Sequence, residues 1–352
     1  MNYASVTHIL PLTAIRRERL LPVPGRVLVR LDQRVSPLDV VAEANISQQH
    51  LLIDVARILR LTPEETRPLI KVRVGDLISA KQMVAQHIGL SPHIVRTPQT
   101  GRVLRIGGGQ VLLEVGDPTF ELYARVPGNV TRLISERGVE ITFTGALVQG
   151  IWGNGRSDMG LMIPLLDAPD SPLSASQLEV NLRGSVVLAG TCQEADVLQA
   201  AEELPLRGLI LGSMSASLIP TALQVSYPLI VLDNIGKRAM NNAAYKLLTT
   251  SDKRDVTLNA DPFDPFTGTR PEVYIPLPVV QEPPVPRSVE VFAPDLPVRL
   301  LRAPSAGAVG TIVNLKPGPS VLPNGLRVAV AEVRLETGEQ LVVPLANLEI
   351  LG

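Results

Sequence analysis

Residues 31–42 read LDQRVSPLDVVA, and residues 74–85 read VGDLISAKQMVA. The two stretches share their spacing: a turn, an apolar position, a second turn and then Val-Ala. A shorter phrase recurs as Pro24–Val27, Thr100–Val103 and Pro127–Val130, and each copy opens a run of alternating apolar residues. Alternation with a period of two is typical of half-buried strands. We therefore predict β-architecture built by repetition, in which the two longer stretches wrap around one another in one body.

Length and composition favour several small, strand-rich units. A chain of 352 residues exceeds one ordinary core, so we expect three domains. Proline occurs 31 times. Because proline fixes φ and lacks a backbone donor, this number favours short strands and ordered loops over long helices. Aromatic residues make up only 3% of the chain, so the cores should consist mainly of Val, Leu, Ile and Ala.

The first half of the chain contains one helical interruption. Apolar residues between Ser47 and Arg60 follow helical spacing, which predicts a helix there. Thr62 offers an N-cap for a second helix, with Pro63 at the first helical position and acidic residues just behind it. We therefore predict a β-rich domain over residues 1–170 with a helical insert.

Three further segments follow residue 170. Residues 171–260 alternate short apolar runs with helical stretches, which predicts a small three-layer α/β domain around a parallel sheet. Residues 261–297 hold about a third of all the prolines, so we expect a Pro-rich strap without a regular central strand. Residues 298–352 return to short strands and fit a small barrel. The predicted fold class is multidomain α+β and α/β.

The repeated stretches carry a family resemblance. Residues 25–44 (GRVLVRLDQRVSPLDVVAEA) and 72–86 (VRVGDLISAKQMVAQ) resemble the half-motifs of the barrel-sandwich hybrid fold. That fold occurs in biotinyl and lipoyl domains and in soluble subunits of ion-pumping electron-transfer complexes. Carrier domains of this kind present a modifiable Lys at a hairpin tip. Lys81 lies inside Ser79–Met83 and departs from that pattern, so we expect no carrier role.

The end of the sequence carries a second resemblance. Residues 298–315 (VRLLRAPSAGAVGTIVNL) and 331–351 (AEVRLETGEQLVVPLANLEIL) resemble a KOW-type SH3-like barrel, with Gly310 at the position of that motif's glycine. Such modules occur in ribosomal and transcription-elongation proteins. The resemblance implies nucleic acid as one partner, but basic and acidic residues balance in this segment, which favours a packing or partner-binding role.

Charge and cysteine content narrow the function classes. The formal net charge is −1 and no segment is strongly basic, so charge does not support nucleic-acid binding, which depends on phosphate neutralisation. The single cysteine, Cys192, excludes an internal disulfide and fits a reducing compartment, and we expect a cytoplasmic protein. No apolar run approaches the roughly 20 residues needed to cross a bilayer, so we expect no membrane insertion.

Polar residues stand at the ends of three predicted parallel strands. Thr191, Ser213 and the pair Asp233-Asn234 fall at the carboxyl ends, where open α/β sheets bind ligands. A crevice for a small polar ligand is therefore one hypothesis. Cys192 precedes a predicted helix, a place where a thiol can be activated, but no histidine lies nearby in the sequence. The three-glycine loop of a dinucleotide site is absent, and we predict no cofactor.

One further segment draws attention because it holds the only tryptophan. Trp152 and Asn154 lie in IWGNGR, where the glycines permit sharp turns or close approach. Trp152 could cap the open end of the barrel, which we favour, or anchor a partner. His87 and His93 have no carboxylate or third donor between them, so we predict no metal site.

The residues contain no constellation that identifies a reaction. We predict a non-catalytic cytoplasmic scaffold or adaptor that binds protein partners or associates with itself. The first alternative is a ligand sensor or enzyme that uses the strand-end crevice. The second alternative is a nucleic-acid-associated KOW protein.

Overall fold

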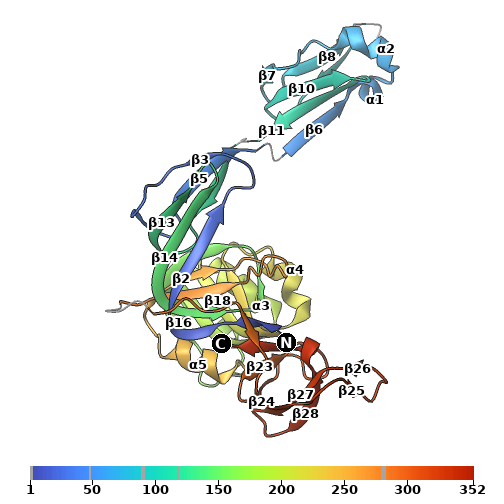
Figure 1. Cartoon of the computed structure of the whole chain (residues 1–352). Helices are drawn as coiled ribbons and strands as arrows, with labels where there is room; N and C mark the ends of the chain where they lie inside the picture. The colour runs from blue at the N-terminus through green and yellow to red at the C-terminus, as the bar shows by residue number, and fades with distance from the viewer. Residues whose placement is uncertain (1–2, 47–48, 89–91, 117–118, 279–282) are drawn as a thin grey trace.

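The computed structural model describes residues 3–46, 49–88, 92–116, 119–278 and 283–352. It contains several sheets, with 47% strand against 13% helix, which confirms the expected β-rich character. Figure 1 shows one small module at the end of the molecule farthest from both termini, joined to a larger body. We call residues 49–115 the outer module, and we call the pair of segments 9–46 and 119–149 the inner module.

The inner module has two layers of strands around a buried aliphatic core that includes Val41, Val130 and Ile141. The strands of its larger layer are, in order, β2 (Ile9–Leu20), β14 (Gly138–Gln149), β13 (Gly128–Ile134) and β4 (Arg34–Val35). The strands of its smaller layer are β12 (Thr119–Tyr123), β5 (Val40–Asn45) and β3 (Arg26–Val27). The outer module is inserted in the chain between β5 and β12.

The outer module has the same arrangement around its own core, which includes Val84, Val103 and Leu113. The strands of one layer are, in order, β6 (Gln49–Asp54), β11 (Gln110–Val115), β10 (Gly101–Gly107) and β7 (Leu77–Ile78). The other layer consists of β8 (Met83–His87) and β9 (His93–Arg96). The module also contains the short helices α1 (Val55–Leu59), α2 (Pro63–Thr66) and η1 (Arg67–Leu69). The predicted cap of α2 is confirmed, because Thr62 and Glu65 form a reciprocal capping box.

The helix predicted over Ser47–Arg60 is mostly a strand. Residues 49–54 form β6, and only Val55–Leu59 are helical, while residues 47–48 lie outside the described part of the chain. Every residue of β6 pairs with β11, so sheet pairing outweighs the helical spacing of the apolar residues. The side chain of Asp54 then caps α1 by accepting a hydrogen bond from Arg57 N.

The two repeated stretches occupy equivalent places in the two modules. Ser36 N donates to Asp39 Oδ2 at 2.7 Å, and Ser79 N donates to Gln82 Oε1 at 2.8 Å. A backbone hydrogen bond is also repeated: Val130 N donates to Gln33 O in the inner module, and Val103 N donates to Asp76 O in the outer module, both at 2.9 Å. Pairings of β7 with β10 and of β4 with β13 also correspond. The repetition seen in the sequence is therefore a duplicated module.

The prediction that the two stretches wrap around one another is wrong. Val41 and Ala42 lie in the core of the inner module, whereas Val84 and Ala85 lie in the core of the outer module. Each stretch instead pairs with a complementary segment of its own module, because strands β10 and β13 supply matching partners.

Strands β16 to β21 form a second region that joins the inner module through β14. β16 (Ser157–Pro164), β17 (Ser185–Cys192), β18 (Gly208–Met214) and β19 (Leu229–Ile235) are parallel, and β20 (Asp255–Asn259) and β21 (Glu272–Pro276) run antiparallel between β16 and β14. The short strand β15 (Trp152–Gly153) pairs with β19 at the edge. One sheet of eleven strands thus spans this region and the inner module.

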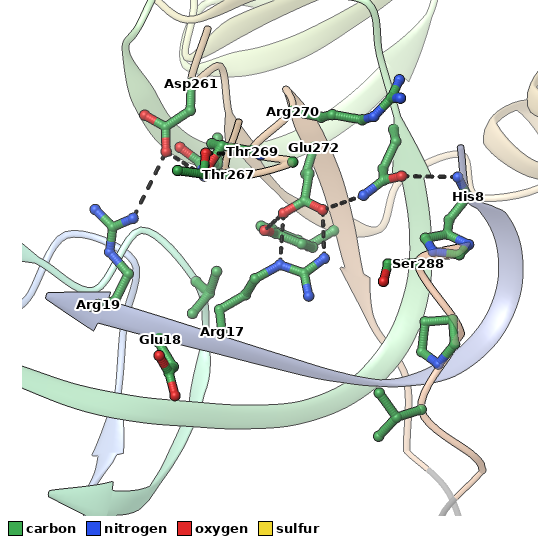
Figure 2. Close-up of a pocket in the computed structure, with 17 residues that line it drawn as sticks. His8, Arg17, Glu18, Arg19, Asp261, Thr267, Thr269, Arg270, Glu272 and Ser288 are labelled. Atoms are coloured by element: carbon green, nitrogen blue, oxygen red, sulfur yellow. Dashed lines mark hydrogen bonds and ion pairs between the residues drawn. The ribbon is translucent and has the colours of Figure 1, made fainter. Parts of the chain in front are cut away.

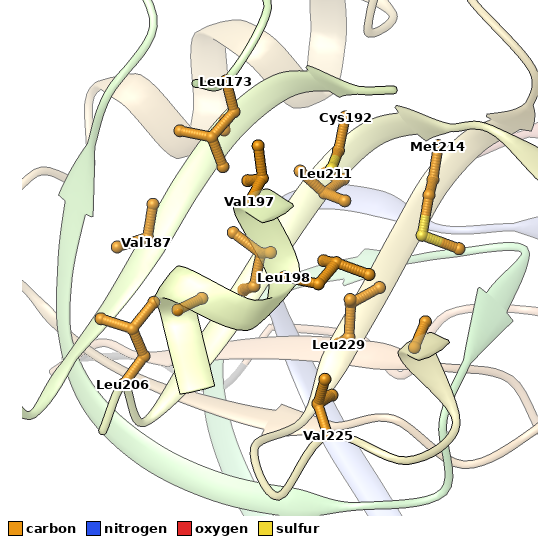
Figure 3. Packing of buried hydrophobic residues seen from close by; sticks show 14 of the residues in the cluster. Leu173, Val187, Cys192, Val197, Leu198, Leu206, Leu211, Met214, Val225 and Leu229 are labelled. Carbon is orange, nitrogen blue, oxygen red and sulfur yellow. The ribbon is translucent and has the colours of Figure 1, made fainter. Parts of the chain in front are cut away.

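Helices cover both faces of the parallel strands. Figure 3 shows Val197 and Leu198 of α3 packing towards Val187, Leu211 and Leu229 of the sheet. A second cluster, which contains Ala244 and Leu248 of α5, covers the opposite face. The helices here are α3 (Ala195–Glu203), α4 (Ile219–Ala222) and α5 (Asn242–Thr249), with 3₁₀ turns η2 (Ala175–Gln177), η3 (Val180–Leu182) and η4 (Ala216–Leu218).

The Pro-rich segment 261–297 contains a central strand, contrary to our expectation. β21 pairs with both β14 and β20, and Glu272, Val273, Tyr274 and Ile275 are buried. Proline stands only at its last position, so the residues before it keep the N–H groups that pairing requires. Residues 279–282 of this segment lie outside the described part of the chain.

The last strands form a C-terminal sheet that also recruits the start of the chain. Its strands are, in order, β22 (Val289–Val291), β1 (Tyr3–Thr7), β29 (Leu348–Leu351), β23 (Pro297–Leu300), β24 (Val309–Leu315), β27 (Val330–Leu335) and β28 (Gln340–Pro344). The same part of the chain contains the 3₁₀ turn η5 (Leu345–Asn347) and a hairpin of β25 (Ser320–Val321) and β26 (Arg327–Val328). β1 is parallel to β29, so strand pairing crosses the predicted domain limits. Of the helices in the described part of the chain, none combines the length and apolarity that crossing a bilayer requires.

Glycine fixes the strand register in both modules. A Cβ atom on Gly101 would lie 2.5 Å from Glu114 O, and one on Gly128 would lie 2.5 Å from Thr142 O. Gly107, at the other end of β10, would place a Cβ in open space.

We expect Gly101→Ala to destabilise the outer module by about 1–3 kcal/mol, because the added methyl group must displace backbone. Gly107→Ala serves as the matched control and should change stability by less than about 0.5 kcal/mol. Amide hydrogen exchange of β10 and β11 measures both effects. Equal protection in the two variants would contradict the close approach at Gly101.

Candidate functional site

The strand-end residues predicted as a site do lie together. Thr191 is the register partner of Ser213, and Ser213 is the register partner of Asn234. Asp233 directly precedes Asn234 on β19. Thr191, Ser213 and Asn234 therefore form one row across β17, β18 and β19, with Asp233 beside it.

Other parts of the chain cover these strand ends. Thr191 N donates to Ser171 O at 2.9 Å, so the segment before β17 runs along its end. Ser213 Oγ donates to Arg238 O at 2.7 Å and accepts from Arg238 N at 3.1 Å. Thr191 Oγ1 is buried without a hydrogen-bond partner. Asn234 lies against the C-terminal part of the chain, since a Cβ on Gly307 would come within 3.0 Å of its Cβ.

Asp233 is neutralised by an arginine from the C-terminal sheet. Arg299, which is 1% exposed, donates from Nη1 to Asp233 Oδ1 at 3.1 Å and to Leu232 O at 2.9 Å. Asn241 N donates to Asp233 Oδ2 at 2.8 Å. The carboxylate that we proposed for ligand binding thus has its hydrogen bonds satisfied within the protein.

Glu349 completes this buried network from the other side. Arg299 Nε donates to Glu349 Oε1 at 2.6 Å, Thr7 Oγ1 donates to Oε2 at 2.9 Å, and Arg270 Nη1 lies 3.3 Å from Oε2. Burial opposes the charge of Glu349, but Arg299 and Arg270 outweigh it and hold the pKa of this carboxyl below its ordinary value. The strand ends therefore form an internal junction with the C-terminal sheet.

Trp152 and Asn154 also have structural surroundings. Trp152 is half-buried and packs against the cluster around α3, and not at the open end of the N-terminal barrel, where we predicted it. Asn154 Nδ2 donates to Tyr227 O at 2.9 Å, and its Oδ1 accepts from Leu229 N at 3.1 Å. These bonds hold the edge of the parallel sheet.

Cys192 does not have the surroundings of a nucleophile. The side chain is buried, and burial raises the pKa of its thiol to about 11. At neutral pH the sulfur stays protonated and therefore weakly nucleophilic.

A polar cavity of about 290 Å³ lies between β2 and the chain around β21 (Figure 2). Arg17 Nε donates to Glu272 Oε2 at 2.9 Å, and Gln149 Nε2 donates to Oε1 at 2.7 Å. Burial opposes ionisation of Glu272, but Arg17 and its hydrogen bonds keep the pKa of this carboxyl below its ordinary value. Sequence reasoning missed this cluster because Glu272 is 123 residues from Gln149 and 255 residues from Arg17.

The charges around this cavity compensate one another. Arg19 lies 3.8 Å from Asp261, which also pairs with Arg125. Burial is the largest influence on His8, followed by Arg17, and together they lower the pKa of its imidazole, so it is neutral at pH 7. Among the residues that line the cavity, Arg17, Arg19 and Arg270 match Glu18, Asp261 and Glu272 in number, which leaves no excess formal charge to favour an ionic ligand.

The outward face of the inner module carries a network of ion pairs. Arg132 lies opposite Glu140 in the strand register, and Glu140 lies opposite Glu18. Arg132 Nη2 lies 2.5 Å from Glu18 Oε1 and 3.3 Å from Glu140 Oε2, and Arg16 Nε lies 3.7 Å from Glu140. This face is polar and its charges are paired.

The outer module has leucines at the positions of the two glutamates. Arg105 lies opposite Leu112, and Leu112 lies opposite Leu52. Arg105 corresponds to Arg132 of the inner module, Leu112 to Glu140 and Leu52 to Glu18. Leu52 is 55% exposed and Leu77, at the edge of the same sheet, is 71% exposed. We call Leu52, Leu77, Leu104, Leu112 and Arg105 the outer-module face.

The duplication supplies the signal that identifies this face. Equivalent strands can be aligned by register, and the alignment places leucines at the positions of two glutamates. In the sequence alone only residues 31–42 and 74–85 align by their spacing, and the pattern around Leu52 predicts a helix, which hides the contrast.

Comparisons with protein-family models and with curated proteins found no match to this chain. Within the residues that the structure describes, no group of three or more His, Cys, Asp or Glu side chains is arranged to hold a metal ion.

The buried network yields one test. Arg299→Leu leaves Asp233 and Glu349 without their shared cation, and we expect the free energy of unfolding to fall by roughly 3–5 kcal/mol. Urea unfolding followed by Trp152 fluorescence measures the loss. Arg334→Leu, an exposed position on β27, is the control. A loss below about 1 kcal/mol for Arg299→Leu would show that the junction does not depend on this ion pair.

The strand ends yield a second test, which compares two neighbouring hydroxyl groups. Thr191→Val removes a hydroxyl that has no partner, so it should maintain or raise the free energy of unfolding. Ser213→Ala removes a hydroxyl that serves both Arg238 N and O, and it should cost about 1–3 kcal/mol. Urea denaturation distinguishes the two, and a clear loss for Thr191→Val would mean that its hydroxyl has a partner after all.

Proposed function

We propose that this chain is a non-catalytic adaptor that uses the outer-module face to dock a protein partner. The observation that carries the proposal is the contrast between equivalent positions: exposed Leu52 and half-buried Leu112 replace the paired Glu18 and Glu140. Because the fold forms with glutamates at these positions, its stability does not require leucines there. Exposed apolar residues that adjoin one another, as opposed to scattered ones, are typical of interaction sites.

Burial of the exposed leucines would contribute free energy to the binding of a partner. Burying a Leu side chain completely contributes about 1.5–3 kcal/mol relative to leaving it in water. Leu52 and Leu77 have much of that contribution still available, since more than half of the surface of each residue is exposed. A partner that covers the sheet would therefore gain affinity from contacts that the free protein lacks.

Finer fold assignments accompany the proposal. We infer that both modules are barrel-sandwich hybrids, supported by the paired layers and the repeated half-motifs. We infer an SH3-like barrel from residue 298 onward, supported by the close approach of Gly310 to Arg334 O, 2.5 Å from the position of a Cβ. The single cysteine supports the cytoplasm as the compartment of an adaptor.

Two observations favour the adaptor over the alternatives. The strand ends that would bind a ligand are covered, and Asp233 is paired with Arg299. In the C-terminal sheet, Arg299 is buried and Lys316 pairs with Glu332 at 3.2 Å, which leaves fewer cations for phosphate.

Site-specific crosslinking tests the proposal. A photoreactive amino acid at position 77 is expected to form adducts with a protein in cells that produce this chain, because Leu77 is part of the outer-module face and is 71% exposed. The matched control is position 34, where Arg34 holds the equivalent place in the inner module. The double variant Leu52→Glu/Leu112→Glu should remove the adducts. Equal crosslinking from both positions, or none from position 77, would reject the docking face.

A further inference from the structure

Arg105 lacks the counterions that its equivalent possesses. Arg132 of the inner module lies between Glu18 and Glu140, at 2.5 and 3.3 Å. Arg105 has Leu112 opposite it in the register, with Leu52 one strand further. Arginine keeps its charge at any physiological pH, and its planar group binds carboxylates in a bidentate manner. The outer-module face therefore presents a cation between leucines, without a carboxylate of its own at either equivalent position.

The rest of the outer module adds to this positive charge. Residues 49–115 contain nine Lys or Arg against five Asp or Glu, a formal charge of +4 with His neutral, although the whole chain carries −1. All nine cations are exposed, and among the described residues no ion pair joins any of them to a carboxylate. Three of the five acidic side chains instead accept hydrogen bonds from backbone N–H groups near them, at Asp54, Glu65 and Asp76.

These observations define the chemistry that would complement the face. This inference rests on the proposed function: we infer that the partner is an acidic amphipathic protein segment. In that segment one carboxylate would bind Arg105, and the apolar side chains on either side of it would pack against Leu52 and Leu112. The inner module shows the equivalent pairing within one chain, where Glu18 and Glu140 satisfy Arg132. The partner would supply from outside what the outer module has lost at these two positions.

Other occupants fit the surface less well. Residues 49–115 contain no Phe, Tyr or Trp, so the module offers no aromatic ring for stacking nucleic-acid bases or for insertion at a membrane interface. A second copy placed face to face would bring together two modules that each carry a formal charge of +4, which repel each other. A carboxylate-bearing peptide meets both the apolar and the cationic parts of the face.

Peptide selection on the intact chain tests the inference. Random 12-residue peptides are displayed on phage, selected on the full-length protein and counter-selected on Leu52→Glu/Leu112→Glu. That variant should fold, because it reproduces the glutamates of the inner module. Selected peptides are expected to carry Asp or Glu between apolar residues. Arg105→Gln should weaken synthetic copies of them roughly tenfold, by loss of a charge-assisted hydrogen bond. Arg132→Gln, the equivalent change in the inner module, should leave their affinity unchanged.

The outcomes separate this inference from the proposed function. Peptides that need Leu52 and Leu112 but carry no acidic residue, or that ignore Arg105→Gln, would overturn the acidic partner and leave the docking face intact. Failure to select any peptide that depends on the two leucines would count against the docking face itself. Stronger, face-dependent binding to phosphatidylserine vesicles or to single-stranded DNA would replace the protein segment with another class of partner. Circular dichroism of each variant verifies that it is folded.

Discussion

The close approach of a glycine to a backbone carbonyl sets the register on which the two modules depend. Gly101 faces Glu114 O and Gly128 faces Thr142 O, and neither position has room for a side chain. Because side chains alternate along a strand, a slip of one residue would exchange the buried and exposed faces of the whole strand. The fixed register decides that Arg132 meets two glutamates and that Arg105 meets two leucines.

A second constraint joins the C-terminal sheet to the parallel strands. Arg299 lies between Asp233 and Glu349, all nearly inaccessible to solvent. Buried ion pairs add little net stability compared with apolar packing, but removal of one partner is costly, so they fix one arrangement of the chain. The polar carboxyl end of β19, which the sequence suggests as a ligand site, instead holds the C-terminal sheet in position through Asp233 and Arg299.

Local patterns predicted the β-rich character, the α2 cap and the equivalence of residues 31–42 and 74–85. They did not predict how segments pair, because that choice depends on distant residues. The helical spacing around Leu52 was outweighed by pairing with β11, and the proline-flanked β21 found its place between β14 and β20. The partner of Asp233 lies 66 residues away, beyond the reach of any local pattern.

Duplication within one chain separates what a fold requires from what it merely tolerates. Positions that match in both modules, such as the turn bonds of Ser36 and Ser79, satisfy the backbone and are needed by both copies. Positions that differ in polarity while keeping the same pairing, as Leu52 and Glu18 do, show that this strand pairing forms with either kind of side chain. An exposed leucine is unremarkable alone, but here the neighbouring copy shows that a charged side chain serves the fold equally well. The difference between the copies is therefore the observation on which the proposed docking face rests.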